Sequence, residues 1–500
     1  MNTVEKWGLF EVSLKGPSAG NPFTEQFVSA TFRSKNEIVT VDGFYDGDGV
    51  YKVRFMPSFT GDYVYETVGS FPEAESAGDF TVTEPTGNNH GPVRIANTYH
   101  FAYEDTTPYY SVGTTCYAWA HQPEEVHKQT LEELDKGYFN KMRFCVFPKH
   151  YIHNFRDPET FPYEGTPVDN SNLTEENFSY FVDFSGNNWD FTRFNPEHFR
   201  RMERCIVELQ ERGIEADIIV MHPYDRWGFS AMNREQDDLY WNYVIARFSA
   251  YRNVWWSLAN EYDLMRAKKL EDWEHYADLL CKKDPYNHMR SIHNCIPFYD
   301  HTRPWITHCS LQRQDLYRHV EYTTDYRTRY QKPIVWDEIA YEGNIDMGWG
   351  NISGQELTRR FWEASMRGGY AGHGETFMNS EDILWWSHGG KLHGESPARI
   401  RFLHEILTQT PGLGLKQGPG AFDETVAVPD EMIPVTGYEI HYYGFGRPSF
   451  RDFVKPAGEN WRVEVIDTWN MTITDAGVHS GKFRIALPGH EYMAVRLTRV

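Results

Sequence analysis

Residues 254–263 read VWWSLANEYD and hold the pattern that decides the fold. The run from Val254 to Leu258 is too hydrophobic for a surface loop, and Asn260 and Glu261 follow it directly. This pattern predicts a buried β-strand that presents a carboxylate at its tip. In a (β/α)8 barrel the carboxyl-terminal tips of the strands form the active-site face, so this polar pair is more typical of chemistry than of packing.

A second stretch repeats the arrangement. Residues 332–343 read KPIVWDEIAYEG, in which Asp337 and Glu338 follow an apolar run. Cleavage of a glycosidic bond needs a carboxylic acid that protonates the leaving oxygen and a carboxylate that attacks or activates water. Carboxylates at the ends of two different strands meet that requirement.

The region from residue 98 to residue 410 alternates strands, loops and helices. A helix is predicted over 196–212, because Asn195 can cap it, Pro196 suits its first turn and Gly213 ends it. Ser353 with Glu356 opens another helix as a capping box. Eight strand candidates lie at 109–117, 141–148, 214–224, 253–263, 288–295, 305–312, 333–343 and 368–377. We therefore predict an α/β fold with a (β/α)8 TIM barrel over 98–410.

Short alternating segments flank this region on both sides. Over residues 1–88 they are separated by Asp-Gly and Gly-Asp dipeptides, which predicts an N-terminal β-sandwich. Residues 83–95, rich in Gly, Pro and Asn, are typical of a linker. The β pattern returns after residue 410 and predicts a C-terminal β-sandwich over 411–500.

Composition narrows the class of function. The 500 residues carry 49 basic and 71 acidic side chains, a formal charge of −22, so nucleic acid is a poor partner. The chain begins without a signal-peptide pattern and holds no apolar run long enough to span a bilayer, which argues against a membrane. Six scattered cysteines fit a reducing, cytoplasmic setting. Aromatic residues make up 16% of the chain, which suits either a large β-rich core or a cleft that stacks on sugar rings.

The long connection over 149–193 is dense in Phe, Tyr and Asn. Loops of this length in a compact domain are usually functional or disordered. We expect this one to form a wall of the substrate cleft and to close a blind pocket.

The two glutamates suit different roles. The acid must keep its proton near neutral pH, and Glu261, flanked by aromatic residues, has surroundings that raise a carboxyl pKa. Glu338 would then be the nucleophile. Asp337, Glu342 and, on the eighth strand, Glu375 compete with Glu338 for this role. Asp263 is either a support for Glu261 or a turn residue.

The Asn-Glu pair at one strand end and the KP-initiated strand that ends in Glu resemble the retaining glycosidases of glycoside hydrolase clan A, nearest to their family-5-like branch. The nucleophile strand of that clan commonly ends Glu-Phe-Gly, whereas this one continues as DEIAYEG. The resemblance implies that Glu261 is the acid/base, Glu338 the nucleophile and Asn260 the ligand of the sugar 2-hydroxyl. It also implies substrate-site roles for another group: Arg143, His222, His308 and either Trp385 or Trp386.

More narrowly, the segment FAYEDTTPYYSVGTTCYAWA, the phrase WDFTRFNPEHF and the flanking domains resemble a bacterial group that includes apiosidases of pectin breakdown. That likeness covers nearly the whole chain and implies that the N-terminal sandwich is immunoglobulin-like. Tyr117 and Trp119, which follow the first strand, belong either to the core or to the cleft. His293 is a further candidate for the site. For each of His222, His308 and His293, a purely structural role is the alternative.

The motifs of other enzyme classes are absent from the sequence. It holds no HExxH, no tight His/Asp triad, no GxGxxG after the first strand and no GxSxG elbow, so we expect no metal and no cofactor. The favoured hypothesis is a retaining exo-glycosidase that acts on small oligosaccharides or plant glycosides by double displacement. A carbohydrate-binding protein with an inactive barrel and a transglycosylase are the alternatives. The flanking domains make a homo-oligomer a further expectation.

Overall fold

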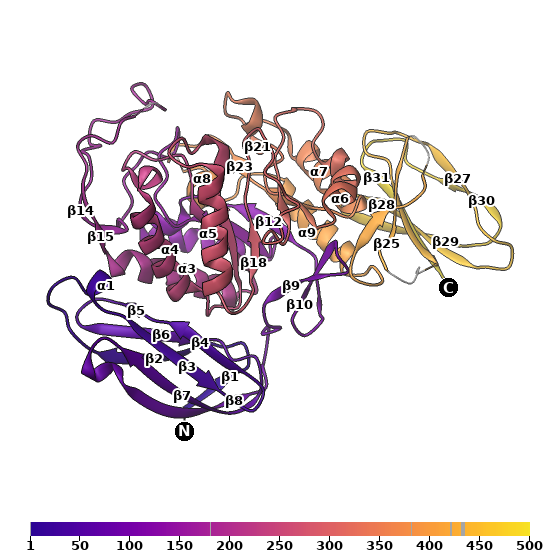
Figure 1. Cartoon of the computed structure of the whole chain (residues 1–500). Helices are drawn as coiled ribbons and strands as arrows, with labels where there is room; N and C mark the ends of the chain where they lie inside the picture. The colour runs from indigo at the N-terminus through magenta and orange to yellow at the C-terminus, as the bar shows by residue number, and fades with distance from the viewer. Residues whose placement is uncertain (1, 181, 382, 421–422, 432–435) are drawn as a thin grey trace.

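The computed structural model describes residues 2–180, 182–381, 383–420, 423–431 and 436–500. Within these residues a central barrel lies between an N-terminal β domain and a C-terminal β domain (Figure 1). The predicted TIM barrel with two flanking β-sandwich domains is therefore confirmed. The described helices include none that is both long and apolar enough to cross a bilayer.

Parallel strands form the wall of the barrel, in the spatial order of their sequence. Each is a short segment whose residues are all buried, as expected of a parallel strand covered by helices. A bridge between His293 and Ser310 closes the sheet between the fifth and sixth strands. The described barrel strands are β12 (Val112–Thr115), β13 (Lys141–Cys145), β16 (Glu215–Met221), β17 (Val254–Ala259), β18 (Met289–Ser291), β19 (Cys309–Ser310), β20 (Ile334–Trp336) and β22 (Tyr370–His373).

Helices connect most of these strands on the outside of the barrel. In α3 the Asn195 side chain accepts a hydrogen bond from the backbone of Glu197, as the sequence predicts. In α7 the Ser353 side chain accepts from the backbone of Glu356, which is one of the two bonds of the predicted capping box. Residues 292–308, between β18 and β19, form turns in place of a helix. The described helices of the barrel are α2 (Glu124–Leu134), α3 (Pro196–Glu211), α4 (Arg234–Phe248), α5 (Leu270–Lys283), α6 (Thr323–Tyr330), α7 (Gly354–Met366), α8 (Trp385–His388) and α9 (Ser396–Leu407).

A small antiparallel sheet covers the amino-terminal end of the barrel. It consists of β9 (Val93–Ala96), β10 (His100–Tyr103) and β11 (Pro108–Tyr109). Phe101 of this sheet packs on Trp255 of β17, with ring centroids 5.2 Å apart, in a cluster that also contains Tyr370. The end of the predicted linker at 83–95 is thus part of a sheet that plugs the amino-terminal end of the barrel. The opposite end, where the carboxyl-terminal tips of the strands lie, is therefore the end left open to a substrate.

The N-terminal domain packs two sheets around a core of aromatic side chains. Phe10 stacks on Phe80 with ring centroids 3.8 Å apart, and Phe32 stacks on Phe55 at 4.3 Å. One sheet has the order β1-β8-β7-β3-β4 and the other β2-β6-β5. Their bounds are β1 (Asn2–Glu5), β2 (Phe10–Lys15), β3 (Val28–Arg33), β4 (Ile38–Asp42), β5 (Phe44–Tyr45), β6 (Val50–Phe55), β7 (Gly61–Gly69) and β8 (Ser76–Thr83), with the short helix α1 (Pro22–Glu25) between β2 and β3.

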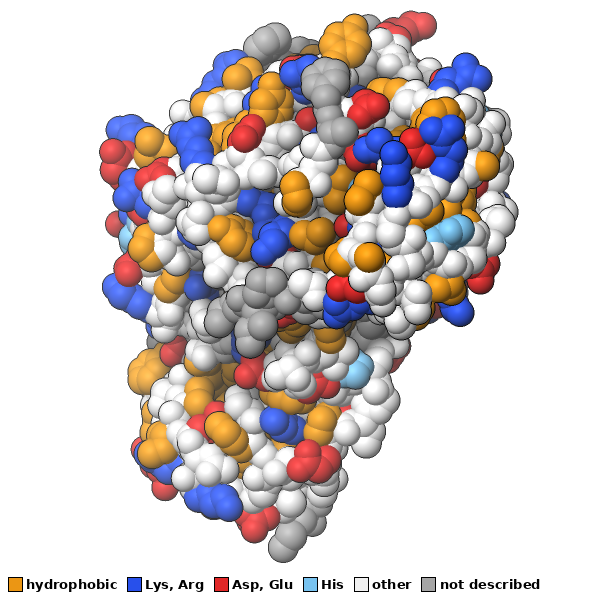
Figure 2. Space-filling model, turned by 90° about the vertical axis from the view of Figure 1, so that its right-hand side faces the viewer, with side chains coloured by type: hydrophobic (Ala, Val, Ile, Leu, Met, Phe, Trp, Pro, Cys, Tyr) orange, Lys and Arg blue, Asp and Glu red, His pale blue; other side chains and the backbone are white. Residues whose placement is uncertain are grey.

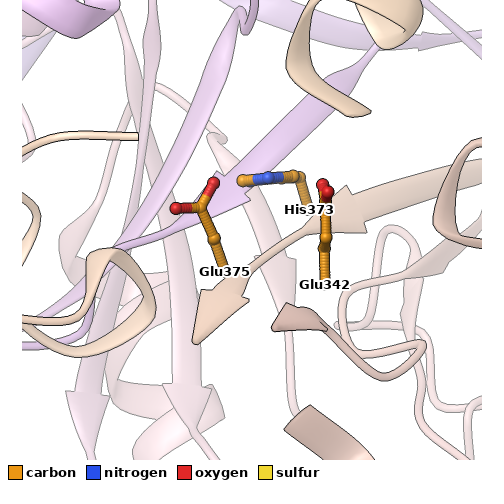
Figure 3. A group of neighbouring side chains, drawn as sticks. All are labelled: Glu342, His373 and Glu375. Atoms are coloured by element: carbon orange, nitrogen blue, oxygen red, sulfur yellow. The ribbon is translucent and has the colours of Figure 1, made fainter. Parts of the chain in front are cut away.

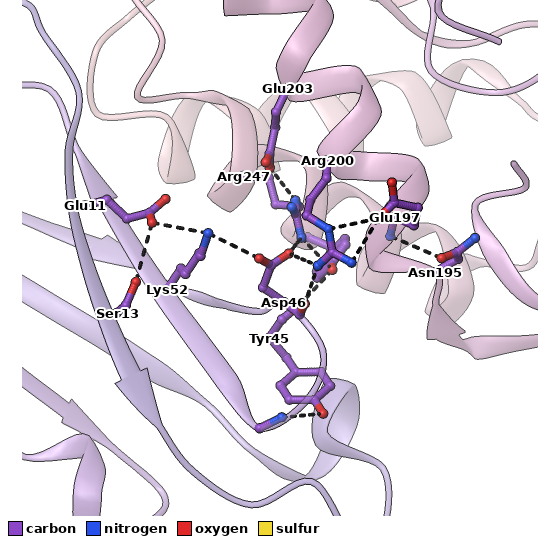
Figure 4. A network of polar contacts seen from close by, with 12 residues as sticks. Glu11, Ser13, Tyr45, Asp46, Lys52, Asn195, Glu197, Arg200, Glu203 and Arg247 are labelled. Atoms are coloured by element: carbon purple, nitrogen blue, oxygen red, sulfur yellow. Dashed lines mark hydrogen bonds and ion pairs between the residues drawn. The ribbon is translucent and has the colours of Figure 1, made fainter. Parts of the chain in front are cut away.

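Buried ion pairs join this domain to α3 and α4 (Figure 4). Arg247 of α4 donates to Glu203 of α3 at 2.6 Å and to Asp46 of the N-terminal domain at 2.8 Å. Arg54 of β6 binds the same Glu203 at 2.6 and 3.0 Å. Each of these charges therefore has a partner across or beside the domain boundary, which is the condition under which a buried charge is tolerated. We call Asp46, Arg54, Glu203 and Arg247 the interface cluster.

The C-terminal domain is a six-stranded antiparallel sheet, to which a separate antiparallel pair of strands, β27 and β30, is added. It lies beside α7 and α9 in Figure 1, and Trp362 of α7 stacks on Tyr442 of β26 with ring centroids 5.3 Å apart. The strands are β24 (Leu415–Gln417), β25 (Thr425–Pro429), β26 (Tyr438–Tyr442), β27 (Phe450–Val454), β28 (Trp461–Asp467), β29 (Thr472–His479), β30 (Lys482–Ala486) and β31 (Met493–Arg499). On the face that Figure 2 draws, acidic and basic side chains are interspersed and do not form a large patch of one sign.

The connection that follows β13 carries a hairpin of its own. β14 (Tyr163–Thr166) pairs with β15 (Asn188–Phe194), and the segment between them extends from the barrel at the upper left of Figure 1. The first residues of this connection stay close to the strand tips, where Tyr151 packs against Tyr224 with ring centroids 4.8 Å apart. The predicted cleft wall is therefore formed by the start of the 149–193 loop.

Candidate active site

Asn260 and Glu261 end β17 at the open face of the barrel. Asn260 is buried, and its backbone N–H donates to the carbonyl of Met221 on β16, which continues the sheet for one more residue. Glu261 then adopts a left-handed conformation with φ of 49°. This conformation costs a non-glycine residue on the order of 1–3 kcal/mol and is typical of functional sites. It ends the strand abruptly and leaves the carboxylate beside the side chains of neighbouring strand tips.

Two neutral donors hold the Glu261 carboxylate. Gln312, which follows β19, donates its side-chain amide to Oε1 at 2.7 Å. The Tyr224 hydroxyl, from the loop after β16, donates to Oε2. Both donors come from other strand tips, so the position of Glu261 depends on the closed barrel and not on local sequence.

Glu338 follows β20 and approaches the same space from another side. The Tyr117 hydroxyl donates to its Oε1, and the same hydroxyl lies 3.3 Å from the side-chain oxygen of Asn260. The His293 Nε2 lies 3.3 Å from Oε1 of Glu338, while its Nδ1 contacts Ser310 at 3.0 Å. Tyr117 thereby connects the two strand ends that the sequence singled out.

Both glutamates line one cavity of about 220 Å³. This volume is below the roughly 300 Å³ at which pockets for drug-sized ligands begin, so it suits a single small ring. Aromatic and polar side chains share its wall. Its lining includes Tyr117, Lys149, Tyr151, Tyr224, Asn260, Glu261, Gln312, Glu338, Tyr341, Trp349 and Trp386.

The two carboxyl groups differ in acidity although they share this space. Burial raises the pKa of Glu261, and the nearby charge of Glu338 raises it further. Burial would also raise the pKa of Glu338, but the His293 ring, the Arg143 guanidinium and the Tyr117 hydroxyl outweigh it and hold the pKa well below its usual range. At neutral pH Glu338 is therefore ionised, whereas Glu261 is the group of the pair that favours its proton.

Arg143 and Asp337 belong to a buried network beneath this cavity. Lys141 donates to both Asp217 and Asp337 at 2.7 Å, and the Arg143 Nε lies 3.5 Å from Asp217. Arg143 also reaches the Asn260 side-chain oxygen at 3.4 Å. Burial opposes ionisation of Asp337, but Lys141 and Arg143 overcome it and push its pKa well below the usual range. Asp337 thus supports the barrel interior and does not compete with Glu338 for the cavity.

Glu342 and Glu375 lie together with His373 in a separate buried group (Figure 3). Glu375 accepts backbone N–H bonds from His393 and Gly394 at 2.6 and 2.8 Å, and Glu342 accepts those of Glu395 and Ser396 at 2.8 and 3.0 Å. Their ligand atoms and that of His373 lie within 4.8 Å of one another, so the residue types suit a metal ion. The carboxylates already anchor residues 393–396 at the start of α9, which is a structural role.

Asp263 is also explained by its contacts. It accepts the backbone N–H groups of Cys295 at 2.6 Å and Ile296 at 2.9 Å. It therefore ties the loop after β17 to the loop after β18. This places it among the supports of the site.

Comparison with known proteins places this geometry in a family. A profile described as "Apiosidase-like, catalytic domain" matches residues 96–396. The chain belongs to the apiosidase-like family. It is a glycoside hydrolase, as the resemblance to clan A implies, and its substrate is a carbohydrate. Two profiles for domains of unknown function, DUF5060 and DUF5605, match residues 3–70 and 430–498.

Solved structures agree with this assignment. A Bacteroides vulgatus protein, provisionally named a glycoside hydrolase, is 34% identical over all of both chains, with a TM-score of 0.92. A glycoside hydrolase family 5 structure from the same species covers 82% of this chain and 94% of its own, at 12% identity and a TM-score of 0.60. The latter likeness concerns the fold alone. No curated protein sequence matches the chain.

Of the predicted aromatic residues of this apiosidase-like enzyme, the structure brings Tyr117 and Trp386 into the cavity. Trp385 instead donates its indole N–H to Thr114 at 2.8 Å and is buried in the core. Trp119 stacks on His127 with ring centroids 4.6 Å apart and is fully buried. Of the two tryptophans predicted as alternatives for the sugar platform, Trp386 lines the cavity and Trp385 has a packing role. Of the two roles left open for Trp119, the structure shows the one in the core.

The two predicted histidines also lie outside the cavity wall. His222 is buried, and its Nε2 contacts the carbonyl of Phe147 at 3.1 Å, which ties β16 to the end of the β13 segment. His308 is wrong as a site residue, because it precedes β19 and packs between Phe101 and Trp255 at the plugged end of the barrel. Burial lowers the pKa of both rings to about 3, so they are neutral core residues.

Several cavity residues were missed by the sequence predictions. Tyr224 and Gln312 follow strands three and six within a few positions, so the rule that polar residues at strand tips face the site could have found them. Lys149, Tyr151 and Trp349 stand further from any strand. For these three the sequence offers only their place in long connecting loops, which is a weak signal.

Proposed function

We propose that this glycoside hydrolase is an exo-acting enzyme that retains anomeric configuration, with Glu338 as nucleophile and Glu261 as acid/base. The observation that carries the proposal is that Glu261 and Glu338 line one small cavity in unlike surroundings, with neutral donors on Glu261 and the His293 ring beside Glu338. These surroundings shift the two carboxyl pKa values in opposite directions. A double displacement needs one protonated and one ionised carboxyl group at the same moment.

The first step follows from these protonation states. The Glu338 carboxylate attacks the anomeric carbon while the bond to the leaving oxygen breaks and Glu261 gives that oxygen its proton. The product is a sugar ester of Glu338. In the second step Glu261 takes a proton from water, the water oxygen attacks the anomeric carbon, and the Glu338 carboxylate leaves.

Other side chains of the cavity support this sequence of events. Tyr117 donates to Glu338 and contacts Asn260, so it can hold the nucleophile and the proposed ligand of the sugar 2-hydroxyl in register. Trp386 and Tyr341 supply apolar faces for the sugar ring. A cavity of about 220 Å³ favours cleavage of one terminal sugar from a small glycoside.

The stereochemistry of the first product tests the mechanism. A panel of nitrophenyl glycosides in both anomeric forms identifies a substrate, and proton NMR within the first minutes reads the anomer released. We expect the anomer of the substrate; the opposite anomer would exclude double displacement. Complete inactivity together with measurable sugar binding would instead support a binding protein with an inactive barrel. Cytoplasmic location and homo-oligomerisation stay predictions.

A further inference from the structure

Lys149 is a buried lysine whose ammonium group meets aromatic rings and no acceptor oxygen among the described residues. Its exposed fraction is 4%, and its Nζ lies 3.5 Å from the ring centroid of Tyr117, 4.5 Å from that of Tyr224 and 5.0 Å from that of Trp386. Burial is the largest influence on the pKa of Lys149 and lowers it, while the nearby charges of Glu261 and Glu338 act in the opposite direction. We call Tyr117, Tyr151, Tyr224 and Trp386 the aromatic cage.

A charge in this position opposes folding. Ring faces offer an ammonium group on the order of 0.5–2 kcal/mol each, whereas removal of the ion from water costs several kcal/mol unless hydrogen bonds replace its hydration. Lysines elsewhere in the chain obtain such bonds. Lys332, which is half-buried outside the cavity, donates to the carbonyls of His301 and Arg303 at 2.7 and 2.6 Å.

The three N–H donors of Lys149 are instead available to the cavity that contains Glu261 and Glu338. We propose that Lys149 is a substrate-binding residue that donates hydrogen bonds to oxygen atoms of the sugar, next to the bond that is cleaved. The aromatic cage fixes the ammonium at the wall of the cavity, so a bound ligand supplies the missing acceptors. This inference rests on the proposed function and deepens it, because it identifies how the sugar is held.

A pH dependence follows from the same geometry. Burial lowers the pKa of Lys149 to about 8, so the ammonium form exists below that pH and the neutral amine above it. The charged and titratable groups that face it are Arg143, Cys145, Tyr117, Tyr151, His222, Tyr224, Glu261 and Glu338. Burial raises the pKa of Cys145 to about 12 and those of the three tyrosines well above 10, so they titrate later than Lys149. Sugar binding through the ammonium should therefore weaken above about pH 8.

The test compares Lys149→Met with Lys332→Met in the full chain. Dinitrophenyl glycosides of common pentoses and hexoses are the probes. Dinitrophenolate is so good a leaving group that it needs little protonation by Glu261, so the titration of Glu261 should not affect the pH dependence of kcat/KM. We expect Lys149→Met to lower kcat/KM at pH 6 by about 10- to 100-fold, the loss for a hydrogen bond from a charged group, and to abolish the fall near pH 8. Lys332→Met should keep the wild-type profile.

Thermal unfolding separates a binding role from a structural one. Because the ammonium is unpaired, Lys149→Met should have a Tm equal to or above that of the wild type, whereas Lys332→Met loses two hydrogen bonds and should have a lower Tm. A kcat/KM for Lys149→Met within about twofold of wild type, or a lower Tm for this variant, would overturn the proposal. If none of the probes is hydrolysed, the proposed function fails. The Tm values of Lys149→Met and Lys332→Met then still show whether the buried Lys149 ammonium lowers the stability of the protein.

Discussion

The interface cluster and the catalytic cavity both bury charged side chains, but they treat them in opposite ways. In the interface cluster Glu203 lies between Arg54 and Arg247. Arg247 also binds Asp46, as Figure 4 shows. Their oppositely charged atoms approach within 2.6–2.8 Å. In the cavity Glu261 is held by neutral donors, and the Lys149 ammonium faces rings.

The difference shows what each arrangement is for. Paired charges satisfy one another, so the interface cluster fixes how the N-terminal domain sits on α3 and α4. Unpaired or unevenly paired charges leave donors, acceptors and protons available to a ligand, at a cost to stability. Substitutions in the cavity should therefore change activity more than stability, and substitutions in the interface cluster should do the reverse.

The largest expected effect comes from Glu338→Ala. Without the nucleophile, turnover of an aryl glycoside should fall on the order of 10⁴- to 10⁶-fold, as for the loss of other nucleophiles. External azide should restore part of the rate and give a glycosyl azide of the opposite anomeric configuration, which NMR identifies. Glu375→Gln is the matched control, because Glu375 binds the backbone of residues 393–394 and its loss should leave turnover little changed. Wild-type turnover in Glu338→Ala would remove Glu338 from the mechanism.

Glu261→Gln should have the next largest effect, and the effect should depend on the leaving group. Loss of a general acid costs about 10²- to 10⁴-fold for a poor leaving group such as a sugar. For dinitrophenyl glycosides the first step should be nearly unaffected, because that leaving group needs no proton. Measured kcat/KM values for both substrate types provide the comparison. Equal losses for the two would show that Glu261 does not act as the acid.

The position of these two glutamates could be predicted because strand tips have a local signature. Val254–Ala259 and Ile334–Trp336 are short apolar runs followed at once by polar residues, and the barrel places all such ends on one face. The same rule misplaced His308. It lies in an apolar run, but β19 begins only at Cys309, so His308 stands at the amino-terminal end of its strand.

Side-chain direction and long-range contacts could not be predicted in this way. Trp385 and Trp386 are neighbours in α8, and successive residues of a helix point about 100° apart, so only the placement of α8 decides which ring faces the cavity. Lys149 stands four residues beyond β13, and its aromatic cage comes mainly from the loops after β12, β16 and β22. A set of contacts between distant loops has no periodicity that a single sequence reveals.

Glu203→Ala tests the stabilising side of the comparison. The change leaves Arg54 and Arg247 buried with one carboxylate fewer, which should lower the free energy of unfolding by about 3–5 kcal/mol. Glu197→Ala, in an exposed pair with Arg200 of the same helix, is the matched control and should cost within about 1 kcal/mol. Denaturant titration measures both, and kcat/KM of folded Glu203→Ala should stay near the wild-type value. A stability equal to that of Glu197→Ala would contradict the role given to the interface cluster.

Tyr117→Phe should have the smallest effect, and it refines the cavity side of the comparison. The Tyr117 hydroxyl donates to the ionised form of Glu338 and thereby lowers its pKa. Without this donor the Glu338 pKa should rise, so the acidic limb of kcat/KM should move to higher pH, while the rate at pH 6 falls by about tenfold. The acidic limb of the kcat/KM profile is measured from initial rates after brief transfer of the enzyme to acidic buffers. An unshifted limb would mean that His293 and Arg143 suffice to keep Glu338 ionised, and it would assign Tyr117 to substrate contact alone.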